Sequence, residues 1–313
     1  MSNSHNIAFL IPCFNEEAAI GHVVTRCKET IPEAKIYVYD NNSTDETAAV
    51  AKQAGAIVRN ETIQGKGNVV RRMFADVDAD IYILCDGDMT YDIASAPEMA
   101  SKLVQQNLDM VVGTRVSDNS PLQTYPTGHA FGNKMLTGIV GSLFGKRFSD
   151  ILSGYRVFSK RFVKSFPAIS RGFEIETELT IHALELRIPV AEMDTPYFSR
   201  PANSESKLNT FRDGFRILMV IIFLLKEVRP LLFFGSIFSA LTLISFTLSF
   251  PLFVTYIETG LVPRFPTAIL ASGIMILAFL TMACGAILDS VSRGRREVKR
   301  MHYLSIKPLE SDK

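Results

Sequence analysis

Two long uncharged stretches near the end of the chain constrain its fold more than any other feature. No charged residue occurs from Leu231 to Ile257, and none occurs from Phe265 to Leu288. Each stretch exceeds the ~20 residues with which a helix crosses the ~30 Å hydrocarbon core of a bilayer. Both are apolar on every face, which disfavours the alternative of two amphipathic core helices. The sequence therefore predicts two transmembrane helices within residues 230–291.

Basic residues flank these stretches unequally. Arginines and lysines precede the first stretch and follow the second, at Arg212, Arg216, Lys226, Arg229, Arg293, Arg295, Arg296, Lys299 and Arg300. The link between the stretches contains only Glu258 and Arg264 as charged residues. Because lysine and arginine mark the cytoplasmic side, we expect an integral protein of the cytoplasmic (inner) membrane with both termini in the cytoplasm. Residues 292–313 would form a basic cytoplasmic tail.

An apolar run with basic flanks precedes the first span, over residues 213–229. It is too short to cross the bilayer, so an amphipathic helix lying on the inner leaflet is expected there, with burial against the preceding domain as the alternative. The net charge of +1 argues against nucleic acid as a partner. The 4 cysteines lack metal-ligand spacing and are interpreted as reduced core residues.

Short apolar runs alternate with amphipathic segments in the first two hundred residues. The expected strands cover residues 7–11, 35–39, 56–58, 79–85 and 109–113. Strands that alternate with helices predict an α/β fold with a mostly parallel sheet. In such sheets, ligands bind at the carboxyl ends of the strands. The polar residues that follow each run are therefore candidates for a site.

Two carboxylates, Asp86 and Asp88, close the expected strand over residues 79–85. They are one residue apart, and the preceding Cys85 belongs to the apolar run and is interpreted as a core residue. Hard oxygen ligands of this kind suit Mg²⁺ or Mn²⁺, and such an ion usually carries a phosphate. The alternative is a solvated Asp-Gly-Asp turn.

Several motifs then follow one another in a characteristic order. They are Pro12-Cys13-Phe14-Asn15-Glu16, Asp40 through Asp45, Gly65-Lys66-Gly67, Asp86-Gly87-Asp88, Asp150 with Ser153-Gly154-Tyr155-Arg156, and Arg200 through Ser206-Lys207-Leu208. This set resembles the family-2 glycosyltransferases of the GT-A fold. More closely, it resembles the polyprenyl-phosphate sugar synthases, which act on dolichyl or undecaprenyl phosphate. The resemblance implies a GT-A (Rossmann-like) catalytic domain over residues 1–212.

The resemblance implies a nucleotide-sugar donor, with UDP favoured over GDP. The implied donor-binding residues are Pro12, Phe14, Glu16, Asp40, Lys66 and Asp86. The first three would line the nucleoside pocket, and Asp40 would accept hydrogen bonds from the base or ribose. Lys66 would lie near the nucleotide, since glycines on both sides permit close backbone approach. Asp86 and Asp88 would hold Mg²⁺ or Mn²⁺ against the donor diphosphate.

The resemblance also implies a lipid phosphate acceptor, undecaprenyl phosphate in particular. The implied catalytic residues are Asp88, Arg115 and Arg156, and the implied acceptor-phosphate residues are Arg200, Ser206 and Lys207. Arginine suits phosphate because its planar fork pairs two oxygens at once. A phosphate monoester is mostly a dianion at neutral pH and needs no general base. Direct displacement would invert the anomeric carbon.

Other functions remain open at this point. A processive polysaccharide synthase is disfavoured because the chain has no tryptophan for the Gln-x-x-Arg-Trp segment of that class. A sugar nucleotidyltransferase is disfavoured because no glycine-rich loop follows Ile11. A membrane transferase acting on a hydroxyl, with Glu176 or Glu178 as base, stays open, as do an inactive membrane scaffold and a homo-oligomer.

Overall fold

The computed structural model describes residues 5–116, 137–138, 140–141, 148–168, 172, 174–198, 219, 222–223 and 225–309. The chain divides into two compact units. The first comprises Met1–Phe215 together with Lys299–Lys313, and the second comprises Arg216–Val298. The sequence also indicates a polar loop at 117–127 and a helix at 132–144. The loop, most of that helix and most of the expected interfacial helix at 213–229 lie outside the described residues.

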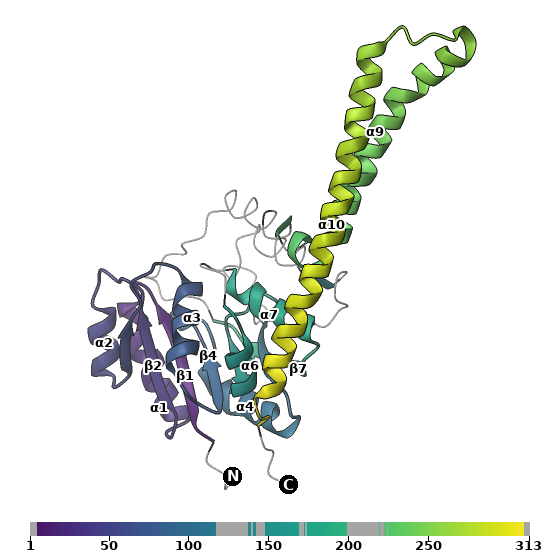
Figure 1. The fold of residues 1–313 in the computed structure, drawn as a ribbon. Helices are drawn as coiled ribbons and strands as arrows, with labels where there is room; N and C mark the ends of the chain where they lie inside the picture. The colour runs from purple at the N-terminus through teal and green to yellow at the C-terminus, as the bar shows by residue number, and fades with distance from the viewer. Residues whose placement is uncertain are drawn as a thin grey trace. The chain divides into compact units, whose positions relative to one another are not determined.

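The first unit is built on a 7-stranded sheet with the order β3-β2-β1-β4-β6-β5-β7 (Figure 1). The strands are β1 (Ile7–Cys13), β2 (Lys35–Asp40), β3 (Ile57–Asn60), β4 (Ile81–Leu84), β5 (Met110–Val116), β6 (Arg156–Ser159) and β7 (Val190–Pro196). All neighbours are parallel except β6, which is antiparallel to both β4 and β5. The predicted mostly parallel α/β sheet is confirmed. The sequence indicates a strand at the end of the segment from Ser149 to Phe158, where β6 lies, but does not indicate its antiparallel direction.

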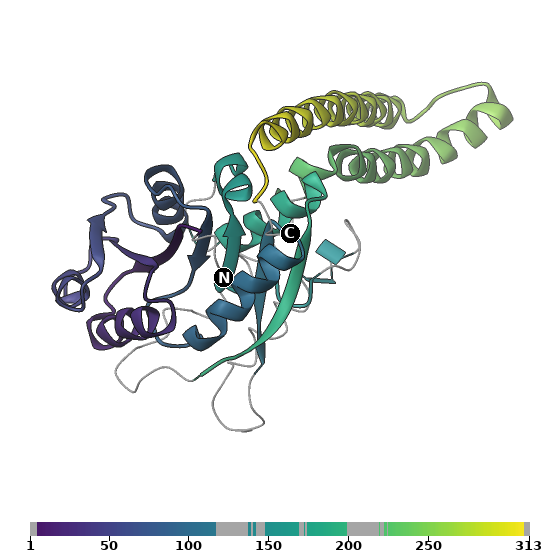
Figure 2. The ribbon, with the colours of Figure 1, turned by 90° about the horizontal axis from the view of Figure 1, so that it is seen from below.

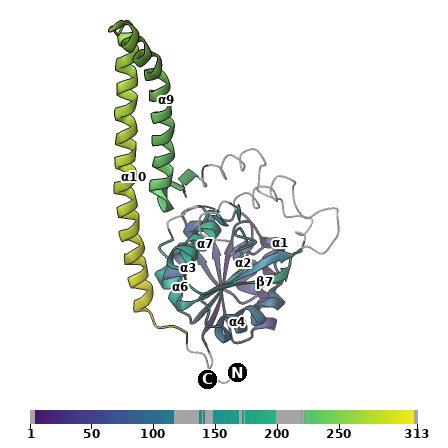
Figure 3. The ribbon, with the colours of Figure 1, turned by 90° about the vertical axis from the view of Figure 1, so that its right-hand side faces the viewer.

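Helices cover both faces of this sheet (Figure 3). They are α1 (Glu17–Thr30), α2 (Thr47–Gln53), α3 (Lys66–Asp76), α4 (Ala96–Gln105), which follows the 3-10 turn η1 (Ile93–Ser95), α6 (Lys160–Ser165) and α7 (Ile175–Leu186). Alternate residues of β1 point to opposite faces. Leu10 packs in the core beneath α3, α6 and α7, whereas Phe9 and Ile11 pack in the core beneath α1, α2 and α4.

Strand direction decides where the loops gather. β6 alone runs against the others, so the carboxyl ends of the remaining strands lie at one edge together with the first residue of β6, Arg156. The polar residues that end β1, β2, β4 and β5 therefore share this edge, as the sequence predicts.

The second unit contains α9 (Pro230–Thr259) and most of α10 (Phe265–Ser305), which run side by side (Figure 1, Figure 2). Both helices are long and apolar enough to cross a membrane. Within α9 the only buried described residues are Pro230 and Ser245, and the Ser245 hydroxyl donates to the Ala271 carbonyl at 2.8 Å. The predicted pair of candidate spans is confirmed.

Helix α10 continues beyond the predicted span, so residues 292–305 of the expected tail are helical. Its last turns belong to the first unit. Tyr303 is buried there, donates its hydroxyl to Asp109 Oδ2 at 2.6 Å and lies under the guanidinium of Arg161 at 4.3 Å from the ring centroid. Arg300 donates to the Leu186 carbonyl at 2.6 Å. These contacts explain why the chain stays helical to Ser305.

Candidate active site

The carboxyl edge of the sheet brings predicted site residues together around Cys13. In the β1–β2 register, Cys13 lies opposite Asp40, the last residue of β2. Burial raises the pKa of the Cys13 thiol, and four carboxylates raise it further: Glu16, Asp40, Asp86 and Asp88. These four carboxylates lie at the ends of three strands, β1, β2 and β4, so the structure gathers residues that the sequence places far apart.

The loops after β1 and β2 hold each other in place. Asn15 Oδ1 accepts a hydrogen bond from the Thr44 amide at 2.8 Å, and the Asn15 amide donates to Ser43 Oγ at 2.9 Å. The Glu16 amide donates to Thr47 Oγ1 at 2.8 Å. Asn15 has a left-handed φ of 55°, which asparagine tolerates better than most residues. The bracing fixes the backbone of the loop while Phe14, Glu16 and Pro12 stay partly exposed at the edge.

Asp40 carries one carboxylate oxygen that is left unsatisfied. Its Oδ2 accepts a hydrogen bond from the Ser43 amide at 3.2 Å. Its Oδ1 is buried, and no donor reaches it from the part of the chain that the structure describes. A buried acceptor without a donor is costly, so this oxygen is suited to a donor group supplied by a ligand.

Asn41 is a structural residue that the sequence analysis missed. Its Nδ2 donates to the carbonyls of Glu61 at 2.8 Å and Ile63 at 2.9 Å, and its Oδ1 accepts from the Gly65 amide at 2.7 Å. It therefore ties the end of β2 to the turn that precedes α3. An asparagine directly after a strand was the available signal, since its side chain readily bonds to nearby backbone.

Lys66 is the first residue of α3 and forms two short ion pairs. Its Nζ lies 2.6 Å from Asp86 Oδ1 and 2.6 Å from Glu176 Oε1. Gly65 precedes it with a φ of 127°, a conformation that only glycine adopts freely. Burial on its own would lower the pKa of Lys66, but the charges of Asp86 and Glu176 outweigh it and raise the pKa above its ordinary value. The ammonium therefore stays charged.

Asp86 and Asp88 follow β4 as predicted. Asp88 is buried, and its Oδ1 accepts hydrogen bonds from Thr90 Oγ1 at 2.6 Å and the Thr90 amide at 3.2 Å. Among the described residues there is no cluster of three or more histidine, cysteine, aspartate or glutamate side chains that could hold a metal ion. Two adjacent carboxylates instead fit an ion that takes its other ligands from a phosphate and water, as Mg²⁺ commonly does.

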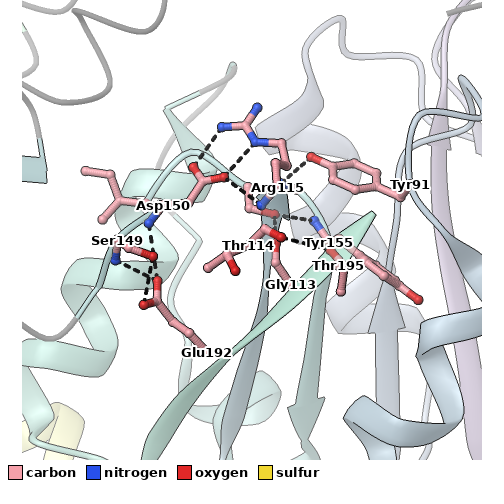
Figure 4. Close-up of polar contacts among 12 residues, drawn as sticks. Tyr91, Gly113, Thr114, Arg115, Ser149, Asp150, Tyr155, Glu192 and Thr195 are labelled. Carbon is pink, nitrogen blue, oxygen red and sulfur yellow. Dashed lines mark hydrogen bonds and ion pairs between the residues drawn. The ribbon is translucent and has the colours of Figure 1, made fainter. Parts of the chain in front are cut away.

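The segment from Ser149 to Tyr155 approaches Asp86 at Gly154. Several hydrogen bonds hold this segment in place (Figure 4). Ser153 Oγ donates to the Gly113 carbonyl at 2.6 Å, and the Gly154 amide donates to the Tyr91 hydroxyl at 2.9 Å. A side chain at Gly154 would place its Cβ 3.0 Å from Asp86 Oδ2 and 3.1 Å from Lys66 Nζ. Glycine at this position lets the segment approach Asp86 and Lys66 closely.

Arg115 is held beside this segment at the end of β5. Its Nε and Nη2 donate to the two carboxylate oxygens of Asp150, each at 2.7 Å (Figure 4). Its guanidinium also lies 5.6 Å from the ring centroid of Tyr197. A bidentate pair of this kind orients the guanidinium well. Neither Asp150 as its partner nor Tyr91 as the support of Gly154 was indicated by the sequence pattern.

Arg156 supports the same segment from below. Its guanidinium is fully buried and donates to the carbonyls of Ser153 and Ile151, each at 2.8 Å, and to Thr180 Oγ1 at 2.9 Å. Burial lowers the pKa of Arg156 to about 10, and the negative charge of Glu176 opposes part of this lowering. Through these contacts Arg156 holds the segment from Ser149 to Tyr155 in place. Contact of Arg156 with an acceptor phosphate stays a prediction. Arg200, Ser206 and Lys207 lie outside the described residues.

Comparison with known proteins agrees with this arrangement. Residues 8–166 match the model of glycosyl transferase family 2. Glycosyltransferase AglJ of Haloferax volcanii is 30% identical over 300 residues, which cover 95% of this chain and 98% of that protein. A dolichyl-phosphate hexose transferase of the same organism is 25% identical over 224 residues, covering 72% of this chain and 96% of that protein.

The fold has solved counterparts. Glucosyl-3-phosphoglycerate synthase from Mycobacterium tuberculosis, crystallised with Mn²⁺, UDP and glucosyl-3-phosphoglycerate, superimposes with a TM-score of 0.58 at 20% sequence identity, covering 71% of this chain and 80% of that one. This likeness concerns the fold. Taken with the family match and the full-length relative, it shows that the chain belongs to glycosyl transferase family 2 and is a glycosyltransferase with a GT-A catalytic fold.

Proposed function

We propose that this glycosyltransferase moves a sugar from a nucleotide-sugar to a polyprenyl phosphate, undecaprenyl phosphate in particular, at the inner face of the membrane. The observation that carries the proposal is the cluster of Asp86, Asp88, Lys66 and Asp40 at one sheet edge, in a chain that also has two candidate membrane spans. The dolichyl-phosphate hexose transferase among the relatives supports a lipid phosphate as acceptor.

The donor would occupy the edge between the ends of β1, β2 and β4. Asp40 Oδ1, buried and unsatisfied among the described residues, would accept a hydrogen bond from the base or ribose, next to Pro12, Phe14 and Glu16. Lys66 would lie beside the diphosphate, because its ammonium already faces Asp86 at 2.6 Å. We favour a UDP-sugar over a GDP-sugar.

Asp86 and Asp88 would hold Mg²⁺ or Mn²⁺, because their oxygens are hard ligands at a strand end. A bound divalent cation would neutralise the charge that develops on the departing nucleoside diphosphate. Thr90 keeps Asp88 oriented through the short bond from its hydroxyl. The close approach of Gly154 limits the space on one side of Asp86.

The acceptor phosphate would attack the anomeric carbon directly. One of its oxygens forms the new bond to carbon while the bond from carbon to the diphosphate oxygen breaks, which inverts the configuration. Arg115, Arg156, Arg200, Ser206 and Lys207 are proposed to gather the phosphates for this step. Glu176 is engaged by Lys66 at 2.6 Å, which favours a phosphate acceptor over a hydroxyl that would need this residue as base.

The two long apolar helices would keep the enzyme at the membrane that holds its acceptor, with the catalytic domain in the cytoplasm. The test is to incubate the purified full-length protein with undecaprenyl phosphate, Mn²⁺ and a panel of radiolabelled sugar nucleotides. We expect one donor to give label in the organic phase that mild acid releases, as for a sugar linked through phosphate. Label that appears only in an acid-stable glycolipid would contradict the proposal.

A further inference from the structure

Lys66 joins three elements that meet beside the carboxylate pair. It begins α3, Asp86 follows β4, and Glu176 lies in the first turn of α7. The Lys66 Nζ is 2.6 Å from an oxygen of each carboxylate. The side chains of Lys66 and Glu176 are only 10% and 6% exposed, whereas that of Asp86 is 26% exposed. The Lys66–Asp86–Glu176 bridge is therefore more open at Asp86 than at Glu176.

Two positive groups act on the two carboxylates of this bridge. The Lys66 ammonium contacts both of them, and the buried guanidinium of Arg156 interacts electrostatically with Glu176. Lys66 is the first residue of α3, and the helix dipole disfavours a positive charge at this end. The two carboxylates therefore stabilise the charge of the ammonium. A divalent cation at Asp86 would compete with the ammonium for the oxygen that Lys66 Nζ contacts at 2.6 Å.

Glu176 offers the ammonium a second partner during that competition. When Asp86 turns to a cation, Lys66 keeps one counterion because Glu176 lies 2.6 Å from its Nζ. Without the charge of Glu176, the ammonium would have Asp86 as its single carboxylate partner in the bridge. Displacing it would then leave a buried ammonium unpaired, and cation binding would become weaker.

We propose that Glu176 is a positioning residue that holds the Lys66 ammonium when a divalent cation replaces it at Asp86, so that Asp86 is available to the cation and Lys66 to the donor diphosphate. The inference rests on the proposed metal-dependent use of a nucleotide-sugar. Glu176 would act on cation binding through Lys66 and would not transfer a proton.

The test is a Mn²⁺ titration of the full-length protein in detergent without donor, read from the electron paramagnetic resonance signal of free Mn²⁺. Glu176→Gln should weaken Mn²⁺ binding by about tenfold, the size expected for one charge a few ångströms away at a partly buried site. In a Lys66→Met background the same substitution should weaken it by about threefold or less, because the competing ammonium is gone and only the direct field of Glu176 remains. Glu176→Asp keeps the charge and should largely restore binding.

A matched control is available on the same helix. Glu185→Gln removes a buried carboxylate that pairs with Lys299 at 3.3 Å, and Mn²⁺ binding should stay unchanged. Lys66→Gln serves as a second neutral background if Lys66→Met does not fold, as judged by thermal unfolding.

The outcomes separate this inference from the proposed function. An equal effect of Glu176→Gln in both backgrounds would overturn the inference, because Glu176 would then act on the cation directly. Wild-type binding by Glu176→Gln would overturn it as well. Failure of the wild-type protein to bind Mn²⁺ with or without UDP would overturn the proposed metal site itself.

Discussion

Asp40→Asn should weaken UDP binding while leaving the stability of the folded protein nearly unchanged. The substitution keeps an oxygen for the Ser43 amide, which donates to Asp40 Oδ2 at 3.2 Å, and removes the negative charge from a buried position. In the free protein Oδ1 has no donor among the described residues, so folding gains nothing from it. We therefore expect the free energy of unfolding to change by less than about 1 kcal/mol.

UDP binding should respond very differently. If the base or ribose donates to Oδ1, the variant loses one charge-assisted hydrogen bond, worth about 1.5–3 kcal/mol. That loss corresponds to a rise of about 10- to 150-fold in the Kd of UDP. The assay is isothermal titration calorimetry of UDP with Mn²⁺ on the detergent-solubilised protein, alongside thermal unfolding.

The neighbouring residue gives a matched comparison. Asn41→Ala removes the bonds to the Glu61 and Ile63 carbonyls and from the Gly65 amide, so it should lower stability clearly. An Asp40→Asn protein that binds UDP with wild-type affinity, or that loses more stability than Asn41→Ala does, would refute the assignment of Asp40 to the donor.

The remaining predictions concern the cation, the acceptor and the membrane. EDTA should abolish transfer, and Asp88→Ala should lower turnover by about 10³-fold in the presence of Mn²⁺, measured by radiolabel transfer; full activity of the variant in EDTA would remove the cation from the mechanism. Lys207→Ala should raise the apparent KM for polyprenyl phosphate by about 10- to 150-fold while the Kd of UDP stays unchanged, and equal effects on both would place Lys207 on the donor side. A cysteine introduced at Gly260 should react with an impermeant reagent in intact cells, whereas one at Ser311 should be protected, and the opposite pattern would reverse the expected orientation.

Some of the fold could be predicted because its signals are local. Each apolar run that ends in polar residues, such as the one before Asp86, marks both a strand and its functional end. The two long uncharged stretches could be identified as candidate membrane spans from their length and composition alone. Parallel strands then place their carboxyl ends at one edge, so the meeting of Asp40 with Asp86 follows from topology.

Other features depend on contacts that no local pattern records. The antiparallel placement of β6 is set by pairing with β4 and β5, which are distant in the sequence. Glu176 has the appearance of an ordinary acid in the first turn of a helix, and only the packing of α7 beside α3 brings it to Lys66. The contact of Tyr303 with Asp109 likewise spans most of the chain.

A comparison of two acceptors tests whether the nucleophile is a lipid phosphate. The full-length protein would receive the same sugar nucleotide and Mn²⁺ with either undecaprenyl phosphate or undecaprenol, its dephosphorylated form, and products would be read by mass spectrometry of the organic phase. We expect a phosphate-linked sugar lipid from undecaprenyl phosphate and no product from undecaprenol, because the hydroxyl would need a general base. Equal or greater transfer to undecaprenol would contradict this expectation.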